Sequence, residues 1–427
     1  MSEKISLPTH VSTLQEWLLY IDSLHSQVID MSLNRIKSVA SDLDILKPAP
    51  FVFLVGGTNG KGTTCHSLEK ILQLSGYKVG VFSSPHMINY TETVRIQGQE
   101  LADSDHIAAF SAINDARQDT TLTPFEFNTL GAFWLMKQAQ VDVAIIEVGM
   151  GGRDDATNII DPDLSVITNV ALDHEDWLGK DIESIGQVKA GIFRAGKPAV
   201  IGQSQAPAAL FDYANSIGAK IHHRDEQWHF TVNDDRWAFT DATGTIADLA
   251  MPLMPLENVA TALAALRVSQ LNVDLAAVKE VILSANLPGR FQIIENKPTV
   301  ILDAAHNPHA AAYLAQRLNH YVKTRNGEKK GKIRFVIGML INKDIKSTVG
   351  HLTPLSDNWY CCAINAGPRS SKAEDVAQYL AQASTYPDIL AGWQAAQQDA
   401  DENDIIVVCG SFFAVAPVLK EIRAQQA

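Results

Sequence analysis

The sequence contains few cysteines, no long apolar run and no excess of positive charge. Its cysteines show neither the spacing of a metal site nor the density of a disulfide-stabilised protein; they are Cys65, Cys361, Cys362 and Cys409. No apolar stretch approaches the roughly 18 residues of a membrane span. Residues 1–12 lack the apolar core of a signal peptide. We therefore expect a cytoplasmic protein with reduced thiols and no membrane partner.

The charge balance is acidic. The formal net charge is −13, from 35 Lys and Arg residues against 48 Asp and Glu residues. Such a chain repels nucleic acid overall, so no nucleic-acid partner is expected. If the substrates are anions, their attraction must come from a local site and from metal ions.

The chain is long enough for two domains. It has 427 residues, of which 46% are hydrophobic and 19% charged, the balance of a globular protein. Through the first half, short apolar runs typical of buried strands alternate with helical patterns. The predicted strands are Phe51–Val55, Lys78–Phe82, Val143–Val148, Ser165–Thr168 and Ala199–Ile201. The predicted helices between them are Thr63–Leu74, Phe125–Lys137 and Ile182–Phe193. This alternation predicts a mostly parallel sheet covered by helices.

The alternation breaks at two short runs, Trp228–Val232 and Arg236–Thr240, that flank Asn233-Asp234-Asp235. This pattern predicts a hairpin, and hence an antiparallel patch at the sheet edge. Two helices, Asn258–Leu271 and Asp274–Ala285, are expected next.

We expect the domain boundary at Leu287-Pro288-Gly289, which gives domains 1–288 and 289–427. Strands and helices alternate again after it. The predicted strands are Val300–Asp303, Ile333–Ile337, Trp359–Ala363 and Ile405–Cys409. The predicted helices are Pro308–Leu318, Ile345–Leu352, Ala373–Gln382 and Val415–Ala424. The fold class is therefore α/β, with a phosphate-loop N-terminal domain and a smaller Rossmann-like C-terminal domain.

A glycine-rich segment, Gly56-Gly57-Thr58-Asn59-Gly60-Lys61-Gly62-Thr63, separates a predicted strand from a predicted helix. Glycines let successive backbone N–H groups converge on one anion, and a helix N-terminus adds partial positive charge. Lys61 supplies a charge for the outer phosphates, and Thr63 or Thr64 can place a hydroxyl on Mg²⁺. A structural turn is the alternative. The coincidence of a buried strand, glycines, threonines and a lysine favours a site for the phosphates of ATP.

Polar residues follow or lie in several of the other predicted strands. Ser84, Glu147 and His174 are candidates for oxygen and nitrogen ligands, and Lys189 lies on a later helix. The carboxyl ends of parallel strands face the ligand crevice, so these four residues together favour a divalent-metal site there. Oxygen ligands suit Mg²⁺, and a histidine ligand leaves room for Mn²⁺.

Each of these residues has a structural alternative. Ser84 could start a turn before Pro85, Glu147 could pair with Arg153, His174 could be an ordinary loop histidine, and Lys189 could be a solvated helix residue. For each residue taken singly, the structural and the functional interpretations are about equally good. Taken together beside a phosphate loop, the residues favour the metal site.

The chain resembles the folylpolyglutamate synthase family, whose bifunctional members are also dihydrofolate synthases and which is related to the Mur peptide ligases. The resemblance covers nearly the whole chain. It rests on the phosphate loop and on these segments: Leu46-Lys47-Pro48-Ala49-Pro50, Ser83-Ser84-Pro85-His86, Tyr90-Thr91-Glu92-Thr93-Val94-Arg95, Glu147-Val148-Gly149-Met150-Gly151-Gly152-Arg153-Asp154-Asp155-Ala156-Thr157-Asn158, Ala171-Leu172-Asp173-His174, Lys189-Ala190-Gly191-Ile192-Phe193, Leu287-Pro288-Gly289-Arg290-Phe291 and Asp303-Ala304-Ala305-His306-Asn307-Pro308.

The resemblance implies a role for each matching residue. The nucleotide would be held by Thr58, Asn59, Gly60, Lys61, Gly62, Thr63, Asn258, Arg290 and Asp303. Two Mg²⁺ ions would be ligated by Ser84, Glu147, His174 and a carbamylated Lys189. The pterin or folate substrate would contact Asp30, Met31, Ser32, Leu33, Thr123, Pro124, Phe125, Glu126, Asp154, Asp155, Ala156 and His306. The residues closest to the chemistry would be Lys61, Lys189 and His174.

The activity that the resemblance implies is ATP-dependent amide formation with L-glutamate. The acceptors would be dihydropteroate, tetrahydrofolate and its polyglutamates, and the protein would be a monomer. In this arrangement residues 1–288 hold ATP and the pterin, and residues 289–427 form the C-terminal ligase domain.

Two other functions are alternatives to this one. A Mur-type ligase acting on a cell-wall nucleotide belongs to the same reaction class, but the pterin-site matches weigh against it. A GTPase-like switch would need a guanine-reading N-K-x-D pattern. Asn342-Lys343-Asp344 lacks the spacer residue of that pattern.

Overall fold

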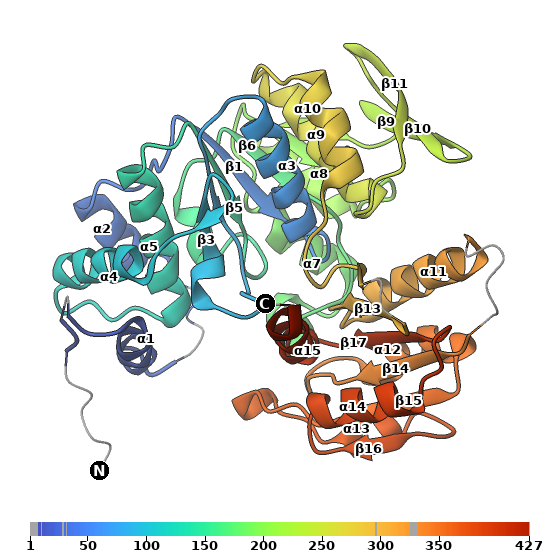
Figure 1. Cartoon of the computed structure of the whole chain (residues 1–427). Helices are drawn as coiled ribbons and strands as arrows, with labels where there is room; N and C mark the ends of the chain where they lie inside the picture. The colour runs from blue at the N-terminus through green and yellow to red at the C-terminus, as the bar shows by residue number, and fades with distance from the viewer. Residues whose placement is uncertain are drawn as a thin grey trace. The chain divides into compact units, whose positions relative to one another are not determined.

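The computed structural model describes residues 7–9, 11–27, 30, 32–294, 297–324 and 331–426. The chain divides into two compact units, Met1–Ala285 and Asn286–Ala427 (Figure 1). The sequence analysis placed the boundary three residues later, between residues 288 and 289. Among the described helices, none is long and apolar enough to cross a membrane.

The first unit is built on an eight-stranded sheet with the strand order β4-β3-β2-β5-β1-β6-β7-β8. Six neighbouring strands pair in parallel, in the order β2-β5-β1-β6-β7-β8, whereas β3 is antiparallel to both β2 and β4. The predicted mostly parallel sheet is therefore confirmed. The bounds are β1 (Phe51–Gly56), β2 (Val79–Phe82), β3 (Val94–Ile96), β4 (Gln99–Glu100), β5 (Val143–Glu147), β6 (Leu164–Ile167), β7 (Pro198–Ile201) and β8 (Lys220–His223).

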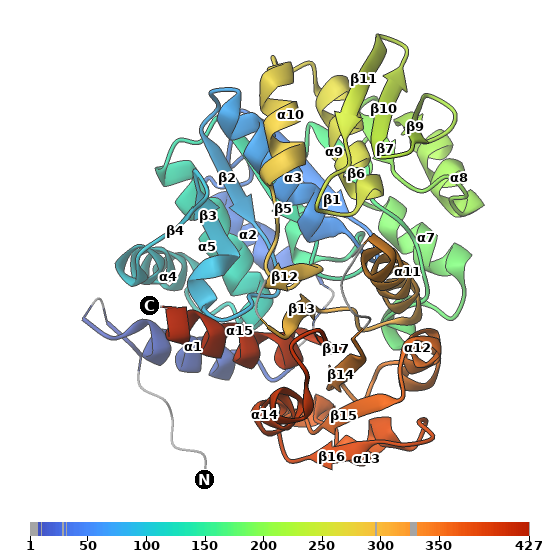
Figure 2. The ribbon, with the colours of Figure 1, turned by 45° about the vertical axis from the view of Figure 1, so that its right-hand side comes forward.

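Helices cover both faces of this sheet, which explains why its central strands are continuous apolar runs. Helices α3 (Lys61–Leu74), α9 (Leu256–Ser269) and α10 (Leu275–Ser284) pack together on one face (Figure 2). Side chains of the other helices join the strands in one hydrophobic core. They are α1 (Leu14–Ser23), α2 (Asn34–Asp42), α4 (Asp103–Arg117), α5 (Pro124–Gln138), α6 (Glu175–Leu178), α7 (Ile182–Ala190) and α8 (Ala208–Ile217).

The start of α5 is fixed by a capping box. The Thr123 hydroxyl accepts a hydrogen bond from the Glu126 N–H at 3.2 Å, and the Glu126 carboxylate accepts one from the Thr123 N–H at 2.7 Å. Pro124 occupies the first helical position, where a missing N–H costs nothing. The sequence therefore dictates where this helix begins, and with it the position of four residues expected at the pterin site.

The predicted hairpin is confirmed as β9 (Trp228–Asn233) and β10 (Arg236–Asp241). The sequence predicted it at the edge of the large sheet, and this placement was wrong. It forms a separate three-stranded sheet with β11 (Gly244–Ala250), because β10 pairs with β9 on one side and β11 on the other. Buried Trp228, Trp237 and Phe239 supply the apolar face of this small sheet.

The second unit contains a six-stranded sheet with the order β12-β13-β17-β14-β15-β16. Only the β12–β13 pair is antiparallel among the strands described. The strands are β12 (Gln292–Ile294), β13 (Thr299–Asp303), β14 (Ile333–Ile337), β15 (Asn358–Cys362), β16 (Ser384–Tyr386) and β17 (Ile405–Cys409). The helices are α11 (Pro308–Thr324), α12 (Ile345–Leu352), α13 (Ala373–Ala377), α14 (Ile389–Asp399) and α15 (Phe412–Gln426).

The prediction for α13 was too long. The helix ends at Ala377, whereas the sequence pattern extended it to Gln382. None of the residues from Gln378 to Gln382 is buried, and Leu380 packs only partly against the core, so little apolar burial supports a further turn of helix.

Candidate active site

The glycine-rich segment lies between β1 and α3, as predicted. Gly60 has a left-handed backbone (φ 85°) and directly precedes the first helical residue, Lys61. A Cβ atom at Gly60 would lie 2.2 Å from the Oδ1 atom of Asn258, so a side chain there is excluded both by backbone strain and by contact. This contact brings Asn258, expected at the nucleotide site, against the loop.

The Lys61 side chain lies over the same loop. Its Nζ atom donates to the carbonyl oxygens of Gly57 at 3.2 Å and Thr58 at 3.3 Å. These two carbonyls hold the ammonium group close to the loop that precedes the N-terminus of α3.

Residues after β6 hold the loop from the other side, and the sequence analysis did not identify them. The Asn169 side chain accepts from the Asn59 N–H and donates to the Asn59 carbonyl, both at 3.0 Å. The Thr168 hydroxyl donates to that carbonyl at 2.7 Å. The Thr58 hydroxyl bonds the backbone of Ala171. These residues could have been found from the sequence, because polar residues directly follow β6, a strand expected to lie in the same sheet as β1.

The four candidate metal residues occur at or after ends of elements around the loop. Ser84 follows β2, Glu147 ends β5 and His174 follows β6, while Lys189 lies in the last turn of α7. Strands β2, β5, β1 and β6 are neighbours in this order, so the three strand-derived residues share the carboxyl edge with the phosphate loop.

Burial separates these residues into two kinds. Glu147 is 5% exposed and Lys189 is 3% exposed, whereas Ser84 is partly exposed and His174 is exposed. His174 also has a left-handed backbone, with φ 54°. In the described ranges, no group of three or more His, Cys, Asp or Glu residues could hold a metal ion. Of the four candidate metal residues, only Glu147 and His174 belong to those residue types. The other two donors would be the Ser84 hydroxyl and Lys189.

The lysine in this set has an altered acidity. Burial, and to a smaller extent the charge of Lys61, lower the pKa of Lys189 from 10.5 to about 7, although Asp173 and Asp155 oppose the shift. Near neutral pH, the neutral amine form of Lys189 is therefore well populated. A neutral amine is the form that reacts with CO₂ to give a carbamate.

The structural alternative for Glu147 finds no support, because Arg153 pairs with Asp154 at 2.9 Å. The cation near Glu147 is Arg95. Burial lowers the pKa of Arg95, but the charges of Glu69 and Glu147, among others, hold it above its ordinary value. Arg95 thus adds positive charge in the surroundings of Glu147, although its direct ion-pair partner is Glu69.

The segments expected at the pterin site come together around Arg35. Its guanidinium pairs with Asp30 at 2.7 Å and with Glu126 at 2.9 Å. Ser32 donates its N–H to Asp30 at 2.9 Å. Leu33 is partly buried against the same core, and Met31 lies outside the described residues. Sequence reasoning missed Arg35, whose partner on α5 is 91 residues away.

The turn that leads to the third pterin segment lies close to the second segment at Gly149 and Phe125. A Cβ atom on Gly149 would lie 2.4 Å from the Phe125 ring, so this glycine allows α5 to approach the turn after β5. Within that turn Asp155 is buried and accepts hydrogen bonds from the Met150 and Thr157 N–H groups at 2.7 and 3.0 Å. Burial raises the pKa of Asp155. Its neighbour Ala156 is also buried.

In the second unit, the residues expected at the nucleotide and substrate lie near the carboxyl ends of β13 and β17. Asp303 accepts from the N–H groups of Phe291 and Ala305, both at 2.8 Å, and burial raises its pKa despite nearby Arg290. The Arg290 guanidinium stacks on the Phe412 ring at 4.6 Å, and the His306 ring lies 6.5 Å from it.

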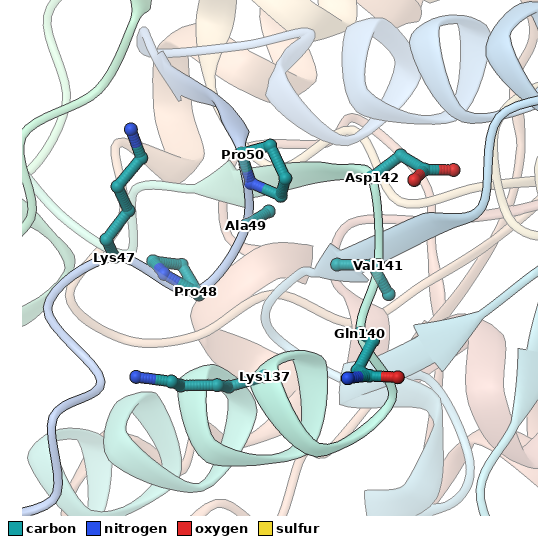
Figure 3. Close-up of a pocket in the computed structure, with 8 residues that line it drawn as sticks. All are labelled: Lys47, Pro48, Ala49, Pro50, Lys137, Gln140, Val141 and Asp142. Atoms are coloured by element: carbon teal, nitrogen blue, oxygen red, sulfur yellow. The ribbon is translucent and has the colours of Figure 1, made fainter.

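A surface pocket lies at the other edge of the first sheet. Its volume is about 360 Å³, and it is formed by the segment before β1 and the turn before β5 (Figure 3). The lining residues are Lys47, Pro48, Ala49, Pro50, Lys137, Gln140, Val141 and Asp142. Because it lies at the amino ends of parallel strands, this pocket is separate from the phosphate loop.

The fold and the loop define a ligase of the Mur type. Residues 55–269 match the Mur ligase middle domain, and residues 289–412 match the Mur ligase glutamate ligase domain. The chain belongs to the dihydrofolate synthase/folylpolyglutamate synthase family within this class. It is 51% identical to the dihydrofolate synthase/folylpolyglutamate synthase of Escherichia coli over 98% of both chains, and 41% identical to that of Haemophilus influenzae over 95% and 96%.

Solved structures agree with this assignment. The structure of E. coli FolC in complex with DHPP and ADP has a TM-score of 0.95 to this chain and covers 99% of it, with 51% identity and all of its own chain matched. A bifunctional folylpolyglutamate synthase/dihydrofolate synthase with Mn, AMPPNP and L-glutamate bound has a TM-score of 0.92, with 48% identity over 98% of this chain and 100% of its own.

Proposed function

We propose that this chain is an ATP-dependent ligase that joins L-glutamate to dihydropteroate, giving dihydrofolate, and to the γ-carboxylate of reduced folates. The observation that carries the proposal is the 51% identity to the E. coli bifunctional enzyme over 98% of both chains. ATP and a divalent cation are the expected cofactors, since relatives have been solved with ADP and with AMPPNP and Mn.

The phosphate loop is proposed to hold the triphosphate. Backbone N–H groups of Thr58–Thr63, the N-terminus of α3 and the Lys61 ammonium group would surround the phosphates with positive potential. Asn258 on α9, whose side chain lies against Gly60, is proposed as a further nucleotide contact. In the second unit, Arg290 and Asp303 are proposed as further nucleotide contacts.

The donor set at the carboxyl edge fits a divalent cation. Ser84 offers a hydroxyl, Glu147 a buried carboxylate and His174 an imidazole, and the neutral amine of Lys189 could become an oxygen-donating carbamate. We propose that these four residues hold two Mg²⁺ ions, with Mn²⁺ as an alternative. The bound cations would neutralise charge between the phosphates and the acceptor carboxylate.

The acceptor is proposed to lie among Asp30–Leu33, Thr123–Glu126, Asp154–Ala156 and His306. The hydrogen bonds and packing of these residues indicate which of them shape the site and which can contact the acceptor. Glu126 and Asp155 use their carboxylates within the chain, so they shape the site. Phe125 presents a ring beside Gly149, and a ring of this kind can stack on a pterin.

The proposed chemistry begins with the acceptor carboxylate, which is a poor electrophile. One of its oxygens attacks the γ-phosphorus of ATP, ADP leaves, and an acyl phosphate forms. The amine of L-glutamate then attacks the acyl carbon and loses a proton, an amide bond forms, and inorganic phosphate leaves with the attacking oxygen. Two unit charges 4 Å apart repel by about 4 kcal/mol at an effective dielectric constant near 20. Lys61 and the loop amides reduce that repulsion.

The test is a phosphate-release assay with ATP, Mg²⁺, L-glutamate and either dihydropteroate or a tetrahydrofolate. We expect release that depends on glutamate with both acceptors. Release with a cell-wall nucleotide acceptor alone would favour the Mur peptide ligases, and rapid GTP hydrolysis without an amino acid would favour a switch protein. No glutamate-dependent release with either pterin acceptor would reject the proposal.

We also propose that the protein works as a monomer in the cytoplasm. All four cysteines are unpaired and buried, as suits a reducing compartment. Size-exclusion chromatography with light scattering tests the oligomeric state, and a particle twice the mass of the chain would contradict it.

A further inference from the structure

Arg95 on β3 joins the phosphate-loop helix to the segment that contains Ser84. Its Nε and Nη2 atoms donate to the two carboxylate oxygens of Glu69 on α3, at 3.3 and 3.0 Å. Its Nη1 atom donates to the Ser83 hydroxyl and to the Glu92 carbonyl, both at 3.1 Å. One guanidinium thus holds three separate pieces of chain.

Glu69 gives this guanidinium a fixed partner. Its carboxylate is 0% exposed and lies on the same helix as Lys61, a little more than two turns further on. Burial raises its pKa, but hydrogen bonds and charge from His66 and Arg95 outweigh burial and bring it to about 2. The carboxylate is therefore ionised, and its position follows that of the phosphate-loop helix.

The segment from Ser83 to Thr93 is closed at its base. The Ser83 N–H donates to the Thr93 carbonyl at 2.9 Å. Inside the segment, the Glu92 carboxylate accepts from three successive N–H groups, those of Met87, Ile88 and Asn89, at 2.6, 2.9 and 2.9 Å. Arg95 bonds Ser83 at one end of this loop and Glu92 near the other, so it fixes the loop as a unit.

We propose that Arg95 is a positioning residue that sets Ser84 in register with the phosphate loop and thereby sets the affinity for the divalent cation. Ser84 is the neighbour of Ser83 and the first residue inside the closed loop. The chain of contacts runs from α3 through Glu69 and Arg95 to Ser83. This inference rests on the proposed role of Ser84 as a metal ligand.

A competing account gives Arg95 only an electrostatic role beside Glu147. The two accounts predict opposite results for a lysine at this position. Lysine keeps the charge, but a single ammonium group cannot form the planar fork that reaches Glu69, Ser83 and Glu92 together. R95K therefore keeps the positive charge near Glu147 but no longer positions Ser84. The positioning account predicts weaker cation binding in R95K, and the electrostatic account predicts unchanged binding.

The experiment is a Mn²⁺ titration of the full chain, followed by electron paramagnetic resonance with AMPPNP present, together with a thermal melt. We expect R95K to raise the Kd for Mn²⁺ about tenfold, the scale for losing support of a metal ligand. The double variant E69L/R95M removes both partners of a buried pair, which commonly preserves stability. It should melt near the wild type but bind Mn²⁺ as weakly as R95K.

The matched control is R334M/D404L, which removes a comparable buried pair (Nε to Oδ2, 2.8 Å) from the second unit. It should leave the Kd for Mn²⁺ unchanged. A wild-type Kd in R95K would overturn the inference, as would a wild-type Kd in a folded E69L/R95M; R95K alone decides if the double variant does not fold. If the wild type binds no Mn²⁺ and releases no phosphate, the proposed function itself fails.

Discussion

The side-chain amide of Asn169 pairs with the backbone of Asn59 through two hydrogen bonds of 3.0 Å each, one donated in each direction. This pairing continues the contact between β6 and β1 beyond the last residues of both strands. It joins the phosphate loop to the segment that leads from β6 to His174. The geometry of the loop therefore depends on a residue 110 positions later in the chain.

Replacing Asn169 should weaken nucleotide binding. N169L removes both hydrogen bonds, and at about 1 kcal/mol each we expect ADP to bind up to about thirtyfold more weakly. N169D keeps an acceptor for the Asn59 N–H but places a carboxylate against the Asn59 carbonyl, so it should not restore binding. Isothermal titration with ADP measures the effect. N358L, in the second unit, is the control, and wild-type affinity in N169L would show that the loop holds its own shape.

Removing the Lys61 ammonium group should abolish ADP release. In K61A the loop keeps its backbone but loses the charge held over the Gly57 and Thr58 carbonyls. The expected result is loss of glutamate-dependent ADP release in a coupled assay. K47A changes a lysine in the pocket at the opposite edge and should turn over normally. Normal turnover in K61A would remove the loop from the mechanism.

Lys189 is expected to act through a carboxylate that it acquires. K189A should therefore lose activity and regain part of it when formate or acetate is added, because a small carboxylate can occupy the space of the carbamate. K197A, at a partly exposed lysine paired with Asp161, should behave as the wild type. Full activity in K189A without added carboxylate would make Lys189 a bystander.

Carbamylation of Lys189 should follow its shifted acidity. The pKa of Lys189 lies at about 7, so the amine is neutral above that pH and protonated below it. At constant dissolved ¹³CO₂ and without metal, nuclear magnetic resonance should show a carbamate signal that falls as the pH drops through about 7. A signal that instead increases only near pH 10.5, the ordinary value for lysine, would contradict the burial effect.

The same burial should cost stability in the metal-free, CO₂-free protein. The folded-state pKa of Lys189, about 7, lies below the unfolded value of 10.5, so the unfolded chain binds the extra proton between them. This group therefore destabilises the fold most at pH 7 and below, and the cost fades as the pH rises toward 10.5. K189M should raise the Tm at neutral pH and lose that advantage at alkaline pH. An equal or lower Tm at neutral pH would count against it.

Local patterns were enough to predict much of the fold. The strands β14 and β17 and the helix α12 have the predicted bounds, because each is a short apolar or amphipathic run between clear turn residues. The phosphate loop was equally readable, since its glycines, lysine and threonines serve one purpose at one place. These features depend on neighbours in the sequence.

Features that depend on distant partners were missed. The last two strands at one side of the sheet, β3 and β4, are three and two residues long and carry little pattern of their own. Asn169 and Arg35 resemble ordinary polar residues until the sheet order brings β6 beside β1 and α5 beside the segment of Asp30. The pterin-site segments were recognised only through family resemblance, because no local rule assigns a pterin to those residue types.

The most direct test of the central claim follows the oxygen atoms of the acceptor. Dihydropteroate labelled with ¹⁸O in its carboxylate is incubated with the enzyme, ATP, Mg²⁺ and L-glutamate, and the inorganic phosphate is analysed by mass spectrometry. Attack of the carboxylate on the γ-phosphorus predicts that one ¹⁸O atom appears in phosphate for each dihydrofolate formed. Dihydrofolate formed with unlabelled phosphate would contradict the account.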